Sequence, residues 1–586
     1  MITNVEIAWV FNEIADLLEI KGENPFKVRA YRQGARVLEQ LPESAVTLAA
    51  TGQLEHIKGI GPALAKKIVE LVETGRCSFH ERLRAEIPPG LLSMLAIPGL
   101  GPKSIRLIYE RLGITTLEEL EEAARRHRLR ELPGMGSKTE WNVLRGIEML
   151  NTSAGKAPLG VAWPLAEGLL QALQAMPEVG EASIAGEIRR GKEMVERICL
   201  VAASEEPERV VKSLQNHPYF REVFRTGPNY LRGVGRLGIT TLVVVVPPAW
   251  YGRALLFYTG SAAHFRQLVE LCPSERRGLL LGIGRLVPGE APEDAEPLPL
   301  VDAGTSEEPR SEEEIYAALG LEYIPPELRE GEGEVEVARA GRLPRLVTVE
   351  DILGDLHVHT NWSDGMDSPE EMAAAAKARG YAYLAVADHS RSLAVARGLS
   401  TERLLEQAAL VRNLGAKWGG LRLLAGAEVD ILPDGSLDFP DEVLAQLDVV
   451  VASIHTGFKQ DQAKIMERLA SALKHPRVHI LGHPTGRLLG RRSPYSVDVE
   501  QLLEIAFRSG KVLEINSIGD RLDLGAEAAR RAAKMGVPLV INTDAHDVAH
   551  LRDMRYGIAV ARRAWLEPRH IINTRPWEEL KGYLGG

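Results

Sequence analysis

The spacing of apolar side chains predicts helices throughout the N-terminal part of the chain. Residues 6–20 carry apolar residues at helical spacing, and so do the segments that follow up to about residue 48. Three similar pieces come next, each with an apolar residue, a Gly-x-Gly turn and an amphipathic helix, and they begin at Ile57, Ile97 and Leu132. The pattern predicts two all-helical units, residues 1–85 and 86–152.

Short apolar runs replace this spacing in the C-terminal part. From Asp351 onwards they alternate with segments of helical spacing, such as residues 369–379 and 401–414. Continuous apolar runs are typical of parallel strands that are buried on both faces. The alternation therefore predicts a barrel of strands covered by helices.

The three Gly-x-Gly turns indicate contacts with an anion. Glycine lets another backbone approach closely, and a helix N-terminus presents unpaired N–H groups. A single turn of this kind could simply cap a helix. Three copies with basic residues nearby are typical of helix-hairpin-helix elements, which bind the DNA backbone without recognising sequence. The predicted DNA-binding residues are Gly59, Gly61, Lys67, Gly99, Gly101, Lys103, Gly134, Gly136 and Lys138.

Composition limits where such contacts can lie. The 586 residues suffice for three or four domains, and the net charge of -10 gives no global case for nucleic-acid binding. Basic and acidic side chains are balanced over residues 1–150, so the acidic surplus lies elsewhere. Three cysteines without a CxxC pair indicate a reducing compartment, and no stretch is apolar enough for a membrane span. We expect a soluble, cytoplasmic, monomeric protein.

Histidine and acidic residues follow the apolar runs of the C-terminal part. His357 and His359 lie two apart on a predicted strand in GDLHVHTNWSDG, so both imidazoles face one side. Strand ends meet at one end of a barrel, and imidazole and carboxylate groups bind zinc, manganese or iron. The alternative is that these are ordinary core histidines, and it would require each of them to follow an apolar run by independent coincidence. The candidate ligands are His357, His359, Asp364, His389, Glu428, His455, His483, Asp544 and His546.

At these positions the chain resembles the PHP (polymerase and histidinol phosphatase) family of metal-dependent phosphoesterases, over roughly residues 351–575. The resemblance implies a distorted α/β barrel of about seven strands with up to three divalent ions, Mn or Zn. It implies three ligand sets: His357, His359, Glu428 and Asp544; then Glu428, His455 and His483; then Asp364, His389 and His546. The implied catalytic residues are His357, His359, Glu428, His455 and Asp544. We expect the nearby Arg397, Lys459 and Arg487 to contact substrate phosphate; a solvated surface patch is the alternative.

The rest of the chain resembles the bacterial family X DNA polymerases, and this resemblance implies a lyase-like helical domain at residues 1–85 and a fingers-like helical domain at residues 86–152. The segment from Asn24, NPFKVRAYRQGARVLEQL, is similar to their lyase domain, in which a lysine forms a Schiff base with a 5′-deoxyribose phosphate. Lys67 takes that place, and a solvated helix-surface lysine is the alternative. Residues 153–328 resemble an α+β palm and thumb, with a Pro-rich acidic loop at 287–309 and a linker at 329–350.

The resemblance in the palm lacks the residues that carry polymerase chemistry. The family holds two metal ions with three aspartates, whose places fall here on Arg197, Cys199 and Leu242. The Gly-Ser pair that cradles the triphosphate becomes Gly186 and Glu187, which would repel it. We interpret the palm as a fold that has lost its chemistry.

The resemblances imply a DNA repair enzyme. The PHP domain would be a metal-dependent 3′–5′ exonuclease or 3′-end phosphoesterase on gapped, nicked or 3′-recessed DNA. One alternative is an active gap-filling polymerase with an associated exonuclease, and the missing carboxylates argue against it. A second is a DNA-end-binding module without catalysis, which intact ligands argue against.

Overall fold

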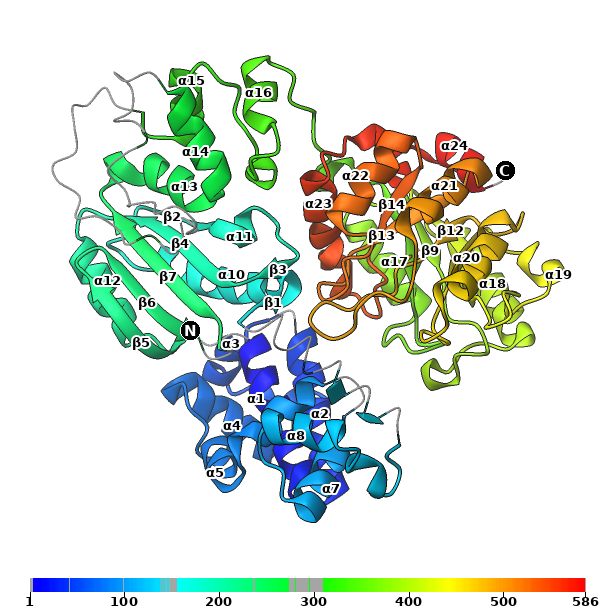
Figure 1. The fold of residues 1–586 in the computed structure, drawn as a ribbon, viewed down its shortest axis with the longest axis horizontal. Helices are drawn as coiled ribbons and strands as arrows, with labels where there is room; N and C mark the ends of the chain where they lie inside the picture. Colours follow the sequence, from blue (N-terminus) through cyan, green and yellow to red (C-terminus); the bar gives the residue numbers. More distant parts are fainter. Residues whose placement is uncertain are drawn as a thin grey trace.

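The computed structural model describes residues 4–41, 43–97, 100–136, 139–140, 143–144, 147, 155–235, 238–272, 280, 295 and 309–584. The predicted DNA-binding residues Gly99 and Lys138 lie outside them, as does most of the predicted loop 287–309. Figure 1 shows three parts: N-terminal helices in blue, a palm and thumb in cyan and green, and a barrel in yellow-green to red. Among the described residues, no helix combines the length and apolar character that a membrane crossing requires.

The N-terminal part is all helical, as predicted. Its α-helices are α1 (Asn4–Ile20), α2 (Pro25–Gln40), α3 (Ala45–Ala50), α4 (Pro62–Thr74), α5 (Ser78–Glu86), α6 (Pro89–Ser93), α7 (Pro102–Leu112) and α8 (Leu117–Arg125). Short 3-10 turns η1 (Leu54–His56), η2 (Met94–Ala96) and η3 (Leu129–Glu131) precede the three Gly-x-Gly turns. One hydrophobic cluster runs from Ile7 to Ile147, so the two predicted helical units share a core.

The three glycine turns have the same backbone hydrogen bond. In each, the residue between the glycines donates to the carbonyl three positions earlier: Ile60 to Ile57 at 3.0 Å, Leu100 to Ile97 at 3.1 Å and Met135 to Leu132 at 3.1 Å. Gly61 and Gly101 cap α4 and α7 with the same dihedrals, φ −83° and ψ 170°. A Cβ at either would meet nothing within 4 Å, so these turns are open to a partner.

The palm is a five-stranded mixed sheet in the order β2-β4-β7-β6-β5. Its strands are β2 (Glu181–Ala185), β4 (Arg197–Ala203), β5 (Phe220–Gly227), β6 (Tyr230–Gly235) and β7 (Thr240–Val246), and the short strands β1 (Ala157–Pro158) and β3 (Met194–Val195) pair beside it. Helices α10 (Leu159–Gln174) and α12 (Pro207–Gln215) pack on one face, whereas α13 (Tyr251–Thr259) packs on the other. The short helix α11 (Gly186–Arg189) connects β2 to the β3–β4 region.

The segment predicted as a linker, residues 329–350, is packed into the thumb. The thumb contains α14 (Ala262–Leu271), α15 (Glu312–Ala318) and α16 (Glu334–Arg339). Glu334 and His264 are fully buried and lie 2.6 Å apart, and the buried Arg329 pairs with Glu312 at 2.5 Å. Arg329 and Glu334 of this segment thus form buried ion pairs with residues of the thumb.

The C-terminal part is a nearly closed barrel of seven parallel strands in the order β14-β13-β12-β11-β10-β9-β8. The strands are β8 (Gly354–Val358), β9 (Tyr383–Val386), β10 (Arg422–Asp430), β11 (Val449–Ser453), β12 (Ile480–Leu481), β13 (Val512–Asn516) and β14 (Leu539–Asn542). A parallel bridge between Val358 and Ala545 joins β8 to the end of β14. The predicted distorted (β/α)7 barrel is confirmed.

Helices cover the outside of the barrel (Figure 1). They are α17 (Pro369–Ala378), α18 (Thr401–Gly415), α19 (Asp441–Leu444), α20 (Gln462–Lys474), α21 (Val499–Ser509), α22 (Ala526–Met535), α23 (Met554–Arg563) and α24 (Trp577–Leu580). Apolar strand residues such as Leu356, Val451 and Val540 form a separate buried cluster. The predicted metal ligands lie outside this apolar cluster, towards the C-terminal ends of the strands.

The palm contacts the barrel without a spacer between them. The Gly160 N–H donates to the Gly519 carbonyl at 3.0 Å, and a Cβ on Gly160 would lie 2.4 Å from the Gly519 Cα. Glu193 of the palm pairs with Arg487 at 2.7 Å and accepts from the Ala526 N–H at 2.9 Å. Backbone contact and a partly buried ion pair therefore fix the barrel against the palm.

Candidate metal centre

All nine predicted ligands meet at the C-terminal end of the barrel. Six of the seven strands carry one to three of them, near or after their C-terminal ends: His357, His359 and Asp364 with β8, His389 with β9, Glu428 with β10, His455 with β11, His483 with β12, and Asp544 and His546 with β14. The Nε2 atoms of His357 and His359 are 3.2 Å apart, as period-two spacing on one strand predicts.

Three groups of ligand atoms are each compact enough to hold an ion. In every group the ligand atoms lie within 4.8 Å of one another, and the groups are His357, His359 and Asp544; His389, Glu428 and His455; and His359, Asp364, His389 and His546. These groups overlap the three sets that the resemblance implies but differ from them. His389 bridges two groups, and His483 contacts Glu428 at 2.8 Å without belonging to a group.

The buried carboxylates and imidazoles shift one another's pKa values. Burial alone would raise the pKa of Glu428, but His455, His389 and His357 hold it well below its usual value. Burial opposes a charge on His455, yet Glu428 and Asp430 raise its pKa to about 10. His359 behaves differently: burial, with His546 and His389 nearby, lowers its pKa to about 4. Ligands with both protonated and neutral imidazoles thus share one recess.

Several ligand atoms are close without forming hydrogen bonds, which fits a metal-binding role. Among the described residues, Glu428 Oε2 and Asp544 Oδ1 are buried and have no hydrogen-bond partner. Nevertheless, Glu428 Oε2 lies 2.7 Å from His389 Nδ1, and Asp544 Oδ1 lies 3.0 Å from His359 Nε2. Unpaired buried carboxylate oxygens are costly, so atoms that converge in this way suit a shared cation.

Acceptors on the far side of three imidazoles orient them toward the recess. His357 Nδ1 lies 2.8 Å from Glu514 Oε1, and His455 Nδ1 lies 2.5 Å from Asp430 Oδ1. His546 Nδ1 lies 2.8 Å from the Asp544 carbonyl. When Nδ1–H donates to an acceptor, the Nε2 lone pair is available to a metal.

The sequence analysis missed these supporting carboxylates. Glu514 and Asp430 lie within β13 and at the end of β10, and Asp388 precedes the ligand His389. Asp388 accepts from the Thr360 N–H at 2.9 Å and from Ser363 and Gln407. An acidic residue inside a continuous apolar run such as VLEIN is the signal that could have identified Glu514, since a buried carboxylate requires a partner.

Two ligands have backbone conformations that non-glycine residues rarely adopt. His483 has φ 28° and Asp544 has φ 52°. Residues held in sparsely populated regions cluster at functional sites, where the surrounding structure maintains them. Here the His483 N–H donates to Glu514 Oε2 at 2.7 Å, and Asn516 Nδ2 donates to Asp544 Oδ2 at 3.0 Å.

The three predicted phosphate contacts differ in environment. Arg397 is exposed on the loop after His389, and Lys459 is exposed on the loop after His455. Arg487 is instead engaged by Glu193 of the palm and donates to the Arg521 carbonyl at 3.1 Å. The structure therefore leaves Arg397 and Lys459 at the surface, whereas Arg487 supports the junction with the palm.

The palm positions at which the resemblance implies catalytic aspartates lie on adjacent strands, as that resemblance requires. Cys199 of β4 pairs directly with Leu242 of β7, and both are fully buried in the core beneath the thumb. Arg197 opens β4 and contacts Glu196 at 3.2 Å. Glu187 is buried, pairs with Lys192 at 3.2 Å and accepts from the Glu196 N–H at 2.6 Å.

In the N-terminal part, Lys67 lies beside aromatic rings. Its Nζ lies 5.1 Å from the centre of the Phe79 ring and 6.0 Å from that of Tyr31, and donates to the Ala63 carbonyl at 3.2 Å. Lys103 is exposed on the first turn of α7, next to Gly101. The expectation of a Schiff-base lysine at position 67 stays a prediction.

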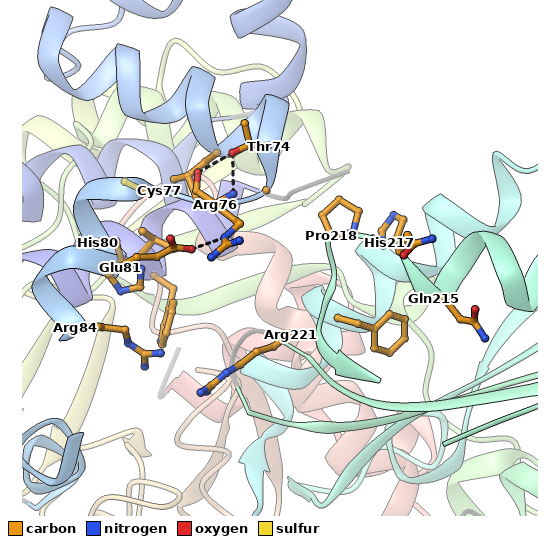
Figure 2. A pocket seen from close by; sticks show the side chains of 16 residues that line it. Thr74, Arg76, Cys77, His80, Glu81, Arg84, Gln215, His217, Pro218 and Arg221 are labelled. Atoms are coloured by element: carbon orange, nitrogen blue, oxygen red, sulfur yellow. Dashed lines mark hydrogen bonds and ion pairs between the residues drawn. The ribbon is translucent and has the colours of Figure 1, made fainter. Parts of the chain in front are cut away.

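A cavity of about 550 Å³ lies between the N-terminal helices and the palm (Figure 2), so it is separate from the metal centre. Arg76, Arg84 and Arg221 line it. Arg76 pairs with Glu81 at 2.5 Å, and Arg84 pairs with Glu13. Acidic partners therefore offset two of the three arginine charges.

Family models match four parts of the chain. They are a helix-hairpin-helix domain at residues 2–77, a SAM-like helix-hairpin-helix tandem at 91–148, a DNA polymerase beta thumb at 254–330 and a PHP domain at 355–518. The barrel and its ligands thus define a PHP domain, a class that binds divalent metals. The helix-hairpin-helix and thumb domains make DNA the partner of this chain.

Curated relatives match either the whole chain or the barrel alone. The DNA polymerase/3′-5′ exonuclease PolX of Bacillus subtilis is 36% identical over 581 residues, which cover 99% of both chains. Probable phosphatases of Acetivibrio thermocellus and Syntrophotalea carbinolica are 29% and 26% identical, over 33% and 39% of this chain and 78% and 95% of theirs. This chain belongs to the bacterial family X DNA polymerases that carry a PHP domain.

Metal binding should release protons and strengthen as pH rises. Without metal, the pKa of His455 is raised to about 10 and that of His546 to about 9, so both imidazoles are protonated at neutral pH. A metal must displace these protons, so the Mn²⁺ affinity should increase from pH 6.5 to 8.5. Calorimetric titration in buffers of different ionisation enthalpy measures the release. Replacing His475, a histidine at the end of α20 and outside the cluster, should not change it; a pH-independent affinity would contradict the prediction.

Proposed function

We propose that the PHP domain is a metal-dependent phosphoesterase that removes nucleotides from DNA 3′ ends, which makes it a 3′–5′ exonuclease. The related removal of 3′-phosphates belongs to the same proposal. The observation that carries the proposal is the convergence of nine histidine and carboxylate ligands in one recess of a DNA-binding chain. The relative of matching length is named as a DNA polymerase/3′-5′ exonuclease, and relatives of the barrel are named as probable phosphatases. The exonuclease and phosphatase parts of these names both describe hydrolysis of a phosphate ester.

The residues of the recess would hold two or three divalent ions, Mn²⁺ or Zn²⁺. Such ions supply Lewis-acid activation of a water and neutralise phosphate charge. Glu514 and Asp430 keep His357 and His455 in the Nδ1–H tautomer, with Nε2 facing the ligands. Glu428, at the centre of the ligands, lies within 3.6 Å of His357, His455 and His483. The exposed Arg397 and Lys459 would bind the phosphates of the entering strand.

Replacement of a ligand should abolish hydrolysis and leave DNA binding intact. His455→Ala or Asp544→Ala removes a group from the recess, whereas the hairpins lie in another part of the chain. Loss of an outer partner alone typically costs about 10–100-fold, so loss of a ligand should exceed that. The measurement is Mn²⁺-dependent digestion of 3′-recessed, 3′-phosphate and abasic DNA, with His475→Ala as the control. Full activity in both ligand variants would exclude the metal-centre assignment.

We further propose that nucleotidyl transfer is absent. Strands β4 and β7 are wholly described and contain no Asp or Glu to hold the two magnesium ions of polymerisation. The side chains at two of the expected carboxylate positions, Cys199 and Leu242, are at most 1% exposed and belong to the hydrophobic core. The buried Glu187 adds a negative charge where a triphosphate would bind. These observations favour an exonuclease over a gap-filling polymerase.

Primer extension tests this proposal in a protein whose nuclease is disabled. The Asp544→Ala variant should incorporate no nucleotide on gapped DNA with either Mg²⁺ or Mn²⁺, because β4 and β7 provide no carboxylate. The nuclease defect prevents degradation from hiding extension, and an active polymerase on the same primer controls for the substrate. Templated extension by this variant would show that the palm is catalytic.

The glycine turns are proposed to hold DNA through phosphates. Lys103→Glu places a negative charge beside the open turn at Gly101, so it should weaken DNA binding several-fold and reduce the dependence of log Kd on log salt by about 1. Fluorescence anisotropy at several salt concentrations measures both quantities. Lys417→Glu makes the same charge change at an exposed site of the barrel and serves as the control. Equal slopes in the two variants would assign the turns to packing alone.

A further inference from the structure

The loop that follows the ligand His389 presents an unusual apolar side chain. Val395 is 91% exposed, the highest value among the large hydrophobic residues that the structure describes. The loop, residues 390–399, leaves the recess at His389 and returns beside it, because the Leu399 N–H donates to the His389 carbonyl at 2.8 Å. Val395 therefore belongs to a loop with both ends at the metal centre.

Internal hydrogen bonds fix the shape of this loop. The N–H groups of Ala396, Arg397 and Gly398 donate to carbonyls of the same loop at 3.0–3.2 Å. Ser392 donates through its N–H to Asp438 at 2.6 Å and through its hydroxyl to Asp430, the carboxylate that also orients His455. The loop holds Val395 in solvent on a rigid support, although burial of an apolar side chain would be favourable.

Cationic and apolar neighbours accompany Val395. Arg391 and Arg397 flank it in the sequence, and both are exposed. A second exposed apolar residue, Met366 at 46%, lies on the loop after β8, and its N–H donates to the carbonyl of the ligand His546 at 2.7 Å. Two loops attached to ligands thus carry apolar tips, and one of these tips lies between cations.

The ligands themselves are recessed. The side chains of His357 and His359 are fully buried and that of Glu428 is 1% exposed, whereas Asp364 and His546 are 32% and 29% exposed. A 3′ nucleotide that is released from its base pair would reach the deeper ligands more readily than one held in the duplex. Apolar side chains inserted at a base step partially unstack it.

We propose that Val395 is a strand-separating wedge that contacts the terminal base pair of a DNA duplex, while Arg391 and Arg397 bind the phosphates beside it. The wedge favours the unpaired 3′ nucleotide that the recess can accept. Val395 is thus a positioning residue for duplex ends, and it has no role once the end is single-stranded. This inference rests on the proposed 3′–5′ exonuclease function.

The test compares full-length wild type with Val395→Ser on DNAs that share one 3′ sequence: a 3′-recessed duplex, the same duplex with a mismatched 3′ end, and the single strand. The variant should digest the paired duplex about tenfold more slowly. Its rates on the mismatched and single-stranded ends should stay within about twofold of wild type. Calorimetric Mn²⁺ binding, which the exposed substitution should not change, verifies the integrity of the centre.

Val349→Ser is the matched control. Val349 is 54% exposed in η7 (Val349–Asp351), just before the start of β8 and thus at the opposite end of the strand from the ligands. Its rates should equal wild type on all three DNAs. Equal slowing of Val395→Ser on paired and single-stranded ends, or no slowing on either, would overturn the wedge while leaving the exonuclease intact. A wild type inactive on every DNA would overturn both.

Discussion

The metal centre depends on one buried carboxylate that is not itself among the predicted ligands. Glu514 accepts from His357 Nδ1, the His483 N–H and the side-chain amides of Asn516 and Asn542, at 2.7–3.1 Å. These donors belong to β8 and β14, the two strands that meet where the barrel closes, to the segment just after β12, and to β13 itself. A fully buried charge is tolerated only when its oxygens are satisfied. Glu514 therefore ties the alignment of four strands to the orientation of a ligand imidazole.

The sequence was sufficient to predict the barrel and to bring its candidate ligands to one end of it, because most of them lie in or after an apolar run and parallel strand ends must meet. It was not sufficient to predict how the ligands are grouped. His389 lies between Glu428 and the loop of Asp364, and this follows from how loops fold over the strand ends. Glu514 escaped prediction for another reason: the acid inside VLEIN signals a buried carboxylate, but its partner His357 lies 157 positions away along the chain.

The palm keeps the paired strand register of a family X palm, although Arg197, Cys199 and Leu242 stand where the resemblance implies aspartates. Cys199 and Leu242 retain the paired register of neighbouring strands, and their apolar character allows the thumb to pack directly over them. Charged groups at these two buried positions would need ions or partners to offset their desolvation. In the segment expected to be a linker, Glu334 forms a buried pair with His264 of the thumb, so this part of the segment packs on the thumb.

The ion pairs that a cation already forms also determine whether it is available to bind a substrate phosphate. Arg487 would have to break its 2.7 Å pair with Glu193 and its bond to the Arg521 carbonyl, leaving both acceptors and loosening the palm against the barrel. That cost opposes any gain from phosphate. Arg397 has no such partner to lose among the described residues, and it is held by a loop tied to His389 and Asp430. Under the proposed function, electrostatic contact with a DNA end would therefore come from the loops that also support the ligands, and sequence-independent binding to the duplex would come from the glycine turns.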